Sequence, residues 1–309
     1  MQKKYSFVFF YFFLLFLLGL TLNVSPAASQ SENKLIDINW SFSAAPIFQS
    51  ESDLDRGGKF SLNHYQVRWA ATKSVSDSTR LGFSIGYDYL DFDFSGTIAF
   101  SGTEPWREVH RISFALPVYY RADEDWQLFI TPSINFSGES DADFSESLRY
   151  GVVATATYRF SPDFSFGAGL GIFQGLEETN VFPFLAVYWK IGEKWLMANP
   201  FSAGPIGPAG LEVTYSPSDL WELGGGGAFR SSRFRLDNDG SAPDGIGESS
   251  GLPVWIRITR KFSRQYKLDF YGGVLLNGEL RIEDRSGRKL GSDDFDPAAF
   301  MAVNISARF

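Results

Sequence analysis

The sequence predicts an all-β protein, a transmembrane antiparallel up-and-down β-barrel of about fourteen strands, with twelve strands as the alternative. Three observations predict this fold. Apolar and polar residues alternate along most of the chain, tight turns alternate with longer connections, and large aromatic residues flank nearly every tight turn. Each feature is typical of proteins that cross a membrane with strands.

The N-terminal segment has the three parts of a secretory signal peptide. Lys3 and Lys4 precede an uninterrupted apolar run at residues 7–18, and small residues follow between positions 25 and 29. The run is shorter than the roughly 20 apolar residues that a transmembrane helix needs. We therefore expect residues 1–28 to be a signal peptide and residues 29–309 to be one barrel domain, located in the bacterial outer membrane. An uncleaved N-terminal anchor is the alternative.

Composition excludes several classes of function. The chain has 28 basic and 36 acidic side chains, and removal of residues 1–28, which hold two lysines and no acid, leaves an excess of ten acids. This charge argues against a nucleic-acid partner. The chain has no cysteine, which excludes disulfides, iron–sulfur clusters and attached c-type haem. We expect no cofactor.

Alternation with a period of two is clearest in the last strand. One face there is apolar and consists of Met301, Val303, Ile305, Ala307 and Phe309. The same pattern recurs over residues 64–71, 81–88, 111–118 and 252–259. In a barrel, the apolar face contacts lipid and the polar face lines the lumen. A soluble β-sandwich also alternates, so the turns and the aromatic residues must decide between the two.

The connections fall into two classes. Six are tight, at residues 76–79, 123–125, 161–163, 192–194, 217–219 and 263–265. Seven are mostly longer, at residues 49–58, 95–106, 139–146, 177–180, 203–206, 237–248 and 285–294. Outer-membrane barrels have short periplasmic turns and longer extracellular loops. The count gives fourteen strands, or twelve if the proline-containing region 195–215 forms none, since proline cannot donate to a ladder.

Aromatic residues beside the tight turns favour the barrel over the sandwich. They include Trp126, Tyr158, Trp189, Trp195 and Trp221, and Phe309 ends the chain at the same level. Aromatic rings are stable at the depth of the lipid headgroups. A soluble sandwich has no reason to place large rings beside its solvent-exposed turns.

With its signal peptide, its alternating strands and a final strand ending MAVNISARF, the chain resembles outer-membrane β-barrel proteins. Phe309 resembles the C-terminal signal that the barrel assembly machinery reads, which implies this machinery as a partner. Residues 35–309 resemble the uncharacterised outer-membrane barrel families known only as domains of unknown function, a resemblance that implies an architecture and no activity. The second resemblance is to the fatty-acid and aromatic-hydrocarbon channels. Those carry a long N-terminal plug, whereas about eight residues separate the expected signal from the first strand here.

Six charged residues are predicted to line the lumen: His64, Arg68, Asp88, Arg111, Arg257 and Asp269. A three-residue turn at 77–79 would place Arg68 directly opposite Asp88, and Arg257 would be diagonal to Asp269. Two interpretations are open. These residues form structural cross-strand ion pairs, or they form a constriction that selects solutes by charge.

No motif predicts an enzyme or a metal site. Residues 247–251 (GESSG) match the G-x-S-x-G pattern, but we expect a flexible surface loop there with no helix after it. Asp237–Gly240 resembles only the start of a calcium loop, and His64 and His110 lack metal-ligand spacing. Gly167, Gly169 and Gly171 share one face, which would leave bare backbone in the lumen, either as a track for a solute or to relieve crowding.

Two functions remain open from the sequence. The first is a passive, porin-like channel for small solutes. The second is a closed structural or adhesion barrel whose acidic extracellular loops carry no transport activity. The expected surroundings are outer-membrane lipid and lipopolysaccharide, with the acidic loops either binding divalent cations loosely or simply solvated.

Overall fold

The computed structural model describes residues 38–96, 100, 104–200 and 209–309. The expected signal peptide lies outside the described residues. Within them, no helix is long and apolar enough to cross a lipid bilayer.

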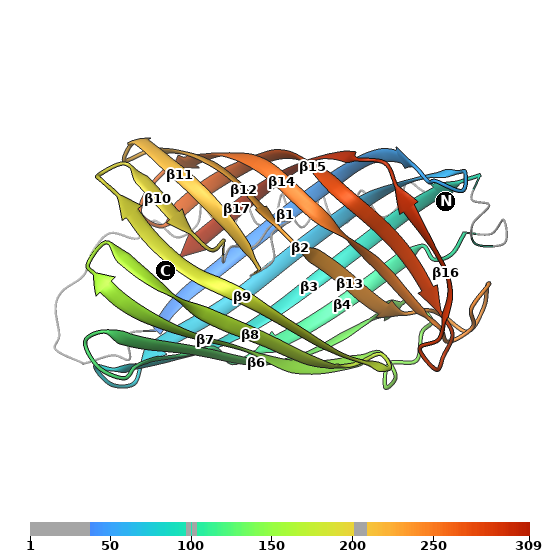
Figure 1. Cartoon of the computed structure of the whole chain (residues 1–309), viewed down its shortest axis with the longest axis horizontal. Helices are drawn as coiled ribbons and strands as arrows, with labels where there is room; N and C mark the ends of the chain where they lie inside the picture. Colours follow the sequence, from blue (N-terminus) through green and yellow to red (C-terminus); the bar gives the residue numbers. More distant parts are fainter. Residues whose placement is uncertain (1–37, 97–99, 101–103, 201–208) are drawn as a thin grey trace, which may run out of the picture. The chain divides into compact units, whose positions relative to one another are not determined.

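Seventeen strands in the described residues form one sheet, which closes on itself where β17 pairs with β1 (Figure 1). The first nine are β1 (Ile38–Asp53), β2 (Lys59–Ser74), β3 (Thr79–Ser95), β4 (Glu108–Ala115), β5 (Val118–Arg121), β6 (Trp126–Glu139), β7 (Leu148–Ser161), β8 (Phe164–Gly175) and β9 (Glu178–Ile191). The others are β10 (Trp195–Ala198), β11 (Gly210–Ser218), β12 (Trp221–Ala228), β13 (Arg230–Arg235), β14 (Ile246–Lys261), β15 (Tyr266–Glu283), β16 (Lys289–Phe295) and β17 (Ala298–Arg308).

Three pairs of these strands are single barrel strands with an interruption. Pro117 separates β4 from β5, and Pro297 separates β16 from β17, because proline has no N–H for the ladder. Phe229 separates β12 from β13. The barrel therefore has fourteen strands, as predicted. The twelve-strand alternative is wrong, since the short β10 pairs with both β9 and β11.

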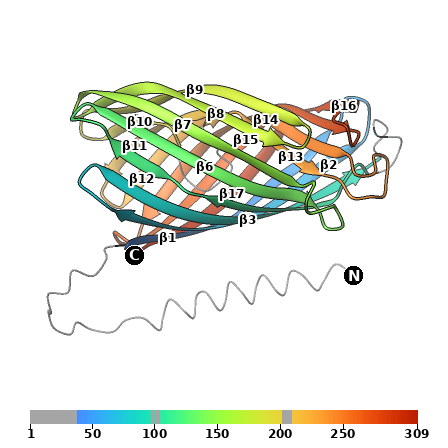
Figure 2. The same ribbon diagram turned by 90° about the horizontal axis from the view of Figure 1, so that it is seen from below.

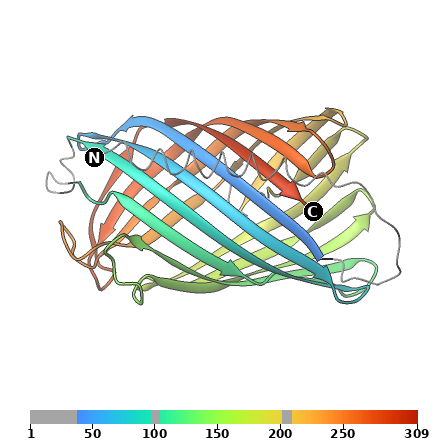
Figure 3. The same ribbon diagram turned by 180° about the vertical axis from the view of Figure 1, so that it is seen from behind.

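The tight turns lie together at one end of the barrel and the longer connections at the other (Figures 1 and 3). We call these the turn end and the loop end. Several loops are shorter than predicted, because strands extend further at the loop end. β1 continues to Asp53, β14 already begins at Ile246, and β16 occupies most of the segment expected to be the last loop.

The two faces of the sheet differ as the alternation predicts. Outward side chains such as Trp69, Ile112 and Ile134 are 37–43% exposed, whereas His64 and Asp88 are almost fully buried inside the barrel. At the turn end the aromatic residues contact one another in a belt, with ring centroids 5.3 Å apart for Trp126–Tyr158 and 4.7 Å apart for Trp195–Tyr215. Such an apolar exterior with an aromatic belt is what lipid selects.

The C-terminal residue closes the seam of the barrel. The N–H of Phe309 donates to the carbonyl of Trp40, and the N–H of Trp40 donates to the carbonyl of Phe309, both at 2.9 Å. The Phe309 ring also contacts Tyr266, with centroids 5.9 Å apart. In Figure 3 the blue β1 lies beside the red β17 at this seam, and in Figure 2 β1 lies at the lower edge of the barrel.

Deletion of Phe309 should therefore reduce assembly, because it removes two hydrogen bonds from the strand pair that closes the barrel and a ring contact with Tyr266 of β15. The measurement is the fraction of heat-modifiable, folded protein in the outer-membrane fraction. Replacement of Phe309 by tyrosine keeps the hydrogen bonds and the ring and should assemble normally. Normal assembly of the deletion variant would contradict a role for Phe309 in closure.

Candidate functional site

Four of the six predicted lumen residues come together inside the barrel. Asp88 accepts from His64 Nε2 at 2.9 Å and from Arg68 Nη2 at 2.8 Å. Arg111 lies directly opposite Asp88 on the neighbouring strand β4. Together with Arg230, described next, these residues form what we call the constriction cluster.

Arg230, on β13, reaches across the lumen to this group. Its Nη2 donates to His64 Nδ1 at 3.1 Å, so His64 Nδ1 must be unprotonated and Nε2 must carry the hydrogen given to Asp88. Arg111 reaches from β4 toward β13, where its Nη2 donates to Ser232 Oγ at 2.5 Å. These two bonds connect β2 and β4 with β13, so they narrow the lumen at this level.

The predicted register of the β2–β3 hairpin is wrong by two residues. Arg68 lies opposite Gly86, and Asp88 lies opposite Gln66. The turn is centred on Asp77, one residue earlier than predicted, and this moves the register by two while leaving every side chain on its predicted face. Arg68 still reaches Asp88 diagonally, because a Cβ at Gly86 would lie 2.6 Å from Arg68 Nη1 and glycine leaves that space free.

Positive charge exceeds negative charge in the constriction cluster. Within the described residues, Arg111, Arg149 and Arg230 have no carboxylate oxygen within 4 Å, although all three are at least partly buried and inward-facing. Arg149 lies on β7 opposite Asn135, two residues along β6 from the partner of Arg111. Asp88 is thus the one carboxylate that contacts Arg68 and His64 here.

The other two predicted residues, Arg257 and Asp269, form a separate network. They lie diagonally on β14 and β15, as predicted, with Nη1 and Oδ1 3.4 Å apart. Glu212 Oε1 lies 2.5 Å from Arg257 Nη2, and Asp269 also accepts from Thr259 at 2.6 Å and Asn304 at 2.8 Å. With Lys261 on Glu222 and Lys267 on Asp269, three bases face three acids. This network therefore connects neighbouring strands and leaves no charge free for a solute.

The glycine face of β8 is not bare backbone. The rings of Phe182 and Phe184, inward on β9, occupy the space that side chains at Gly171 and Gly169 would need. The glycines therefore relieve crowding, and the lumen wall here is aromatic. Phe173 extends the same wall, with its ring 5.9 Å from that of Phe182.

The loop end is crossed by a segment that we call the mouth strap, residues 233–245. β13 stays paired with β14 up to Arg235, and both of its faces are buried from Ser232 onward, so other parts of the barrel cover this strand on both sides. Arg235 makes a parallel bridge to Gly138 of β6, on the opposite wall (Figure 1). Phe234, fully buried, packs against Trp106 and Phe92 with ring centroids 5.2 and 6.1 Å away.

Two arginines hold the mouth strap in place. The guanidinium of Arg233 forms ion pairs with three carboxylates, those of Glu283 at 2.8 Å, Glu248 at 2.9 Å and Glu178 at 3.0 Å. Arg235 donates to the carbonyl of Asp244 at 2.9 Å and to that of Glu146 at 3.1 Å.

The loop that carries the Glu146 carbonyl is itself ordered by Asp143. Ser145 and the backbone N–H groups of Ser145 and Glu146 donate to the Asp143 carboxylate, and these bonds lower its pKa. The fixed loop presents its carbonyl to the mouth strap. The loop end is therefore closed both by apolar packing and by ion pairs.

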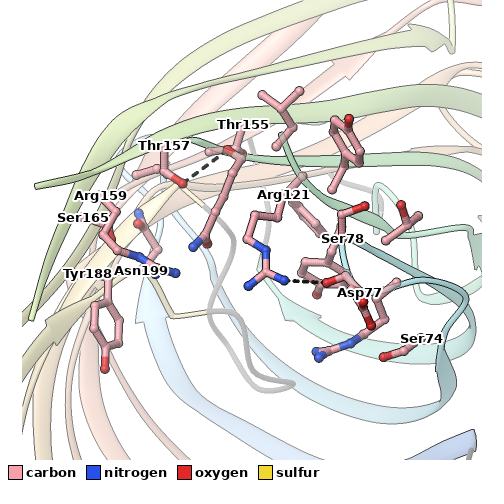
Figure 4. Close-up of a pocket in the computed structure, with 18 of the residues that line it drawn as sticks. Ser74, Asp77, Ser78, Arg121, Thr155, Thr157, Arg159, Ser165, Tyr188 and Asn199 are labelled. Carbon is pink, nitrogen blue, oxygen red and sulfur yellow. Dashed lines mark hydrogen bonds between the residues drawn. The ribbon is translucent and has the colours of Figure 1, made fainter. Parts of the chain in front are cut away.

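The turn end contains a cavity of about 760 Å³ (Figure 4). Most of the residues that line it have polar side chains, among them Ser74, Arg121, Thr155, Thr157, Arg159 and Asn199. Arg121 donates to the carbonyl of Asp77 at 2.6 Å. On β2, β3 and the β4–β5 strand, the cavity residues lie nearer the turns than the constriction cluster does, so the cavity is on the turn side of that cluster.

The chemical motifs weighed in the sequence do not form sites in the described residues. Residues 247–251 belong to strand β14 and pair with β13 and β15, so the expected flexible loop is wrong. No helix follows, and the strained turn that a nucleophilic serine needs is missing there. No three acidic or histidine side chains converge on a metal position within the described ranges. His110 faces outward, and its Nδ1 is hydrogen-bonded to the Tyr87 hydroxyl at 2.8 Å.

Several site residues were not predicted. Glu212 lies on the polar face of an alternating segment, LEVTY, and that pattern could have identified it. Arg230, Arg233 and Arg235 lie in the segment RSSRFR, which has no alternation, so no periodic signal could place them.

Comparison with known proteins gives structures of low identity and one family. The COG4313 outer membrane channel from Pseudomonas putida F1 is 12% identical, with a TM-score of 0.48 over 93% of this chain and 100% of that chain. The translocator domain of autotransporter NalP from Neisseria meningitidis is 10% identical, with a TM-score of 0.38 over 98% and 96%. The Pseudomonas putida toluene transporter TodX is 8% identical, with a TM-score of 0.40 over 87% and 89%. These scores are too low to carry an argument.

A search of curated proteins finds no match. A family model described as a domain of unknown function (DUF6268) matches residues 71–309. Since this is well over half of the chain, the protein belongs to the DUF6268 family.

Proposed function

We propose that the protein is a passive channel of the bacterial outer membrane for small solutes, closed at its loop end in the conformation described here. The observation that carries this proposal is the cavity of about 760 Å³ at the turn end, which is lined largely by residues with polar side chains, with the constriction cluster beyond it. A barrel with a purely structural role needs neither a cavity of this size nor lumen arginines that have no carboxylate partner among the described residues. The apolar exterior and the aromatic belt support insertion in lipid, with the turn end toward the periplasm.

A closed structural or adhesion barrel is the second candidate, and the mouth strap favours it. Phe234 and Leu236 fill the loop end, together with inward side chains of β2, β3 and β15. In this case the acidic loops would contact lipopolysaccharide, directly or through loosely bound divalent cations. Under either function we propose assembly by the barrel machinery through the strand that ends at Phe309, and we propose no enzymatic role.

Conductance in a planar lipid bilayer separates the two candidates. We expect the purified, folded protein to give discrete but infrequent conductance steps, because the mouth strap has to leave the loop end before ions pass. Heat-denatured protein is the control and should give none. Absence of steps from the wild-type protein and also from a variant with a weakened mouth strap would refute the channel.

A further inference from the structure

The surplus positive charge of the constriction cluster predicts a bound anion. Arg68, Arg111 and Arg230 face one carboxylate, that of Asp88, and His64 is neutral in the hydrogen-bonded arrangement described above. A guanidinium that is taken out of bulk water without a partner is unfavourable. An anion at this level would supply the missing partner.

Arg149 extends this positive region along the lumen wall. Its Nε is buried and has no hydrogen-bond partner in the described residues. Glu178 and Glu248, the acids that act on Arg149 electrostatically, both form ion pairs with Arg233 of the mouth strap, at 3.0 and 2.9 Å. The Nη2 of Arg149 donates to the side-chain oxygen of Asn180 at 2.9 Å, so it is the Nε that is left for a ligand between Arg149 and Arg111.

An apolar strip begins at the same arginine. The guanidinium carbon of Arg149 lies 5.1 Å from the centre of the Phe173 ring. From Phe173 the strip continues to Phe182 and Phe184, with successive centroids 5.9 and 6.3 Å apart. These rings lie on the lumen side, because the neighbouring residues Val181 and Leu185 point outward and are 57% and 55% exposed.

We propose that this wall binds organic monoanions, each a carboxylate attached to a flat apolar body, of which benzoate is a simple example. The carboxylate would lie between Arg111 and Arg149, where guanidinium groups can donate two parallel hydrogen bonds. The apolar body would lie along Phe173, Phe182 and Phe184, where ring stacking favours an aromatic group. The inference rests on the proposed function to the extent that the ligand has to enter the lumen.

Calorimetric titration of the folded protein in detergent micelles tests the proposal with three probes. Sodium benzoate should bind saturably, and at least about tenfold more tightly than sodium acetate or benzyl alcohol. Acetate lacks the apolar ring, and benzyl alcohol lacks the carboxylate. Arg149→Gln should weaken benzoate binding by about tenfold. Arg264→Gln removes an exposed arginine at a tight turn and should leave binding unchanged.

Phe184→Leu provides an independent variant that changes no charge, in case Arg149→Gln does not assemble. It should weaken benzoate binding and leave the weak acetate binding as it was. Equal affinities for acetate and benzoate would overturn the apolar half of the site. No saturable benzoate binding by heat-modifiable, folded protein would overturn the site itself.

The two proposals fail separately in these experiments. Saturable benzoate binding without conductance from any variant would refute the channel and leave the anion site standing. Conductance without benzoate binding would refute the anion site and leave the channel standing.

Discussion

Simultaneous replacement of Arg233 and Arg235 by alanine should raise the bilayer conductance of the protein several-fold over the wild type. Each change leaves carboxylates or carbonyls at the loop end without their buried cation, and removal of one partner from a buried ion pair costs about 3–5 kcal/mol. The mouth strap then keeps its backbone pairing with β14 and the apolar contacts of Phe234 with Trp106 and Phe92, but it loses its side-chain bonds to β15 and to the β6–β7 loop. The strap should leave the lumen for a larger fraction of the time.

Arg285→Ala is the matched control for this variant. Arg285 also forms an ion pair with Glu146 at the loop end, but its side chain is 64% exposed. Exposed ion pairs contribute about 1 kcal/mol or less, so conductance should stay at the wild-type level. If the double variant is folded and heat-modifiable yet conducts no more than the control, the mouth strap does not close the barrel.

Val67→Arg should destabilise the barrel far more than Arg68→Gln. Val67 faces outward near the middle of β2, and an arginine on the lipid face near the bilayer midplane costs about 2–4 kcal/mol. Arg68 faces the lumen, where its side chain is 33% exposed, and Asp88 keeps its bond to His64 when Arg68 is replaced. The measurement is the denaturant midpoint of the protein in lipid vesicles.

Labelling of a cysteine at position 68 is a second test of which face of β2 points to the lumen and which points to lipid. The thiol of Arg68→Cys should react with a water-soluble maleimide, because the side chain faces the hydrated lumen. The thiol of Trp69→Cys should react with a lipophilic reagent instead. The opposite pattern would mean that the inward and outward faces of this hairpin are reversed.

The sequence predicts the parts of this fold that depend on periodicity. Alternation identifies which face of β2, β3 and β17 points inward, and the aromatic residues mark the turn end, because both features follow from contact with lipid. Register depends instead on where a turn is centred. Ser76, Asp77 and Ser78 are equally suited to a turn, so composition could not fix its centre or place Arg68 opposite Gly86.

The mouth strap could not be predicted for a different physical reason. Its residues interact with partners that are 50 or more positions away in the sequence, as Arg233 does with Glu283 at the end of β15 and Arg235 does with Glu177 between β8 and β9. A Gly-, Ser- and Asp-rich segment is predicted to be an exposed loop when such partners are unknown. The same limit applies to the constriction cluster. Alternation predicts that Asp88 and Arg111 face the lumen, but it does not predict the position of Arg230.

The reversal potential of the open channel in a salt gradient tests the central claim most directly. The barrel has an overall excess of acids, so a lumen without its own charge pattern would prefer cations. If the constriction cluster controls passage, the Arg233→Ala, Arg235→Ala variant in a potassium chloride gradient should give a reversal potential of the sign expected for chloride. A reversal potential near zero, or one of the sign expected for potassium, would contradict a lumen that selects anions through Arg68, Arg111 and Arg230.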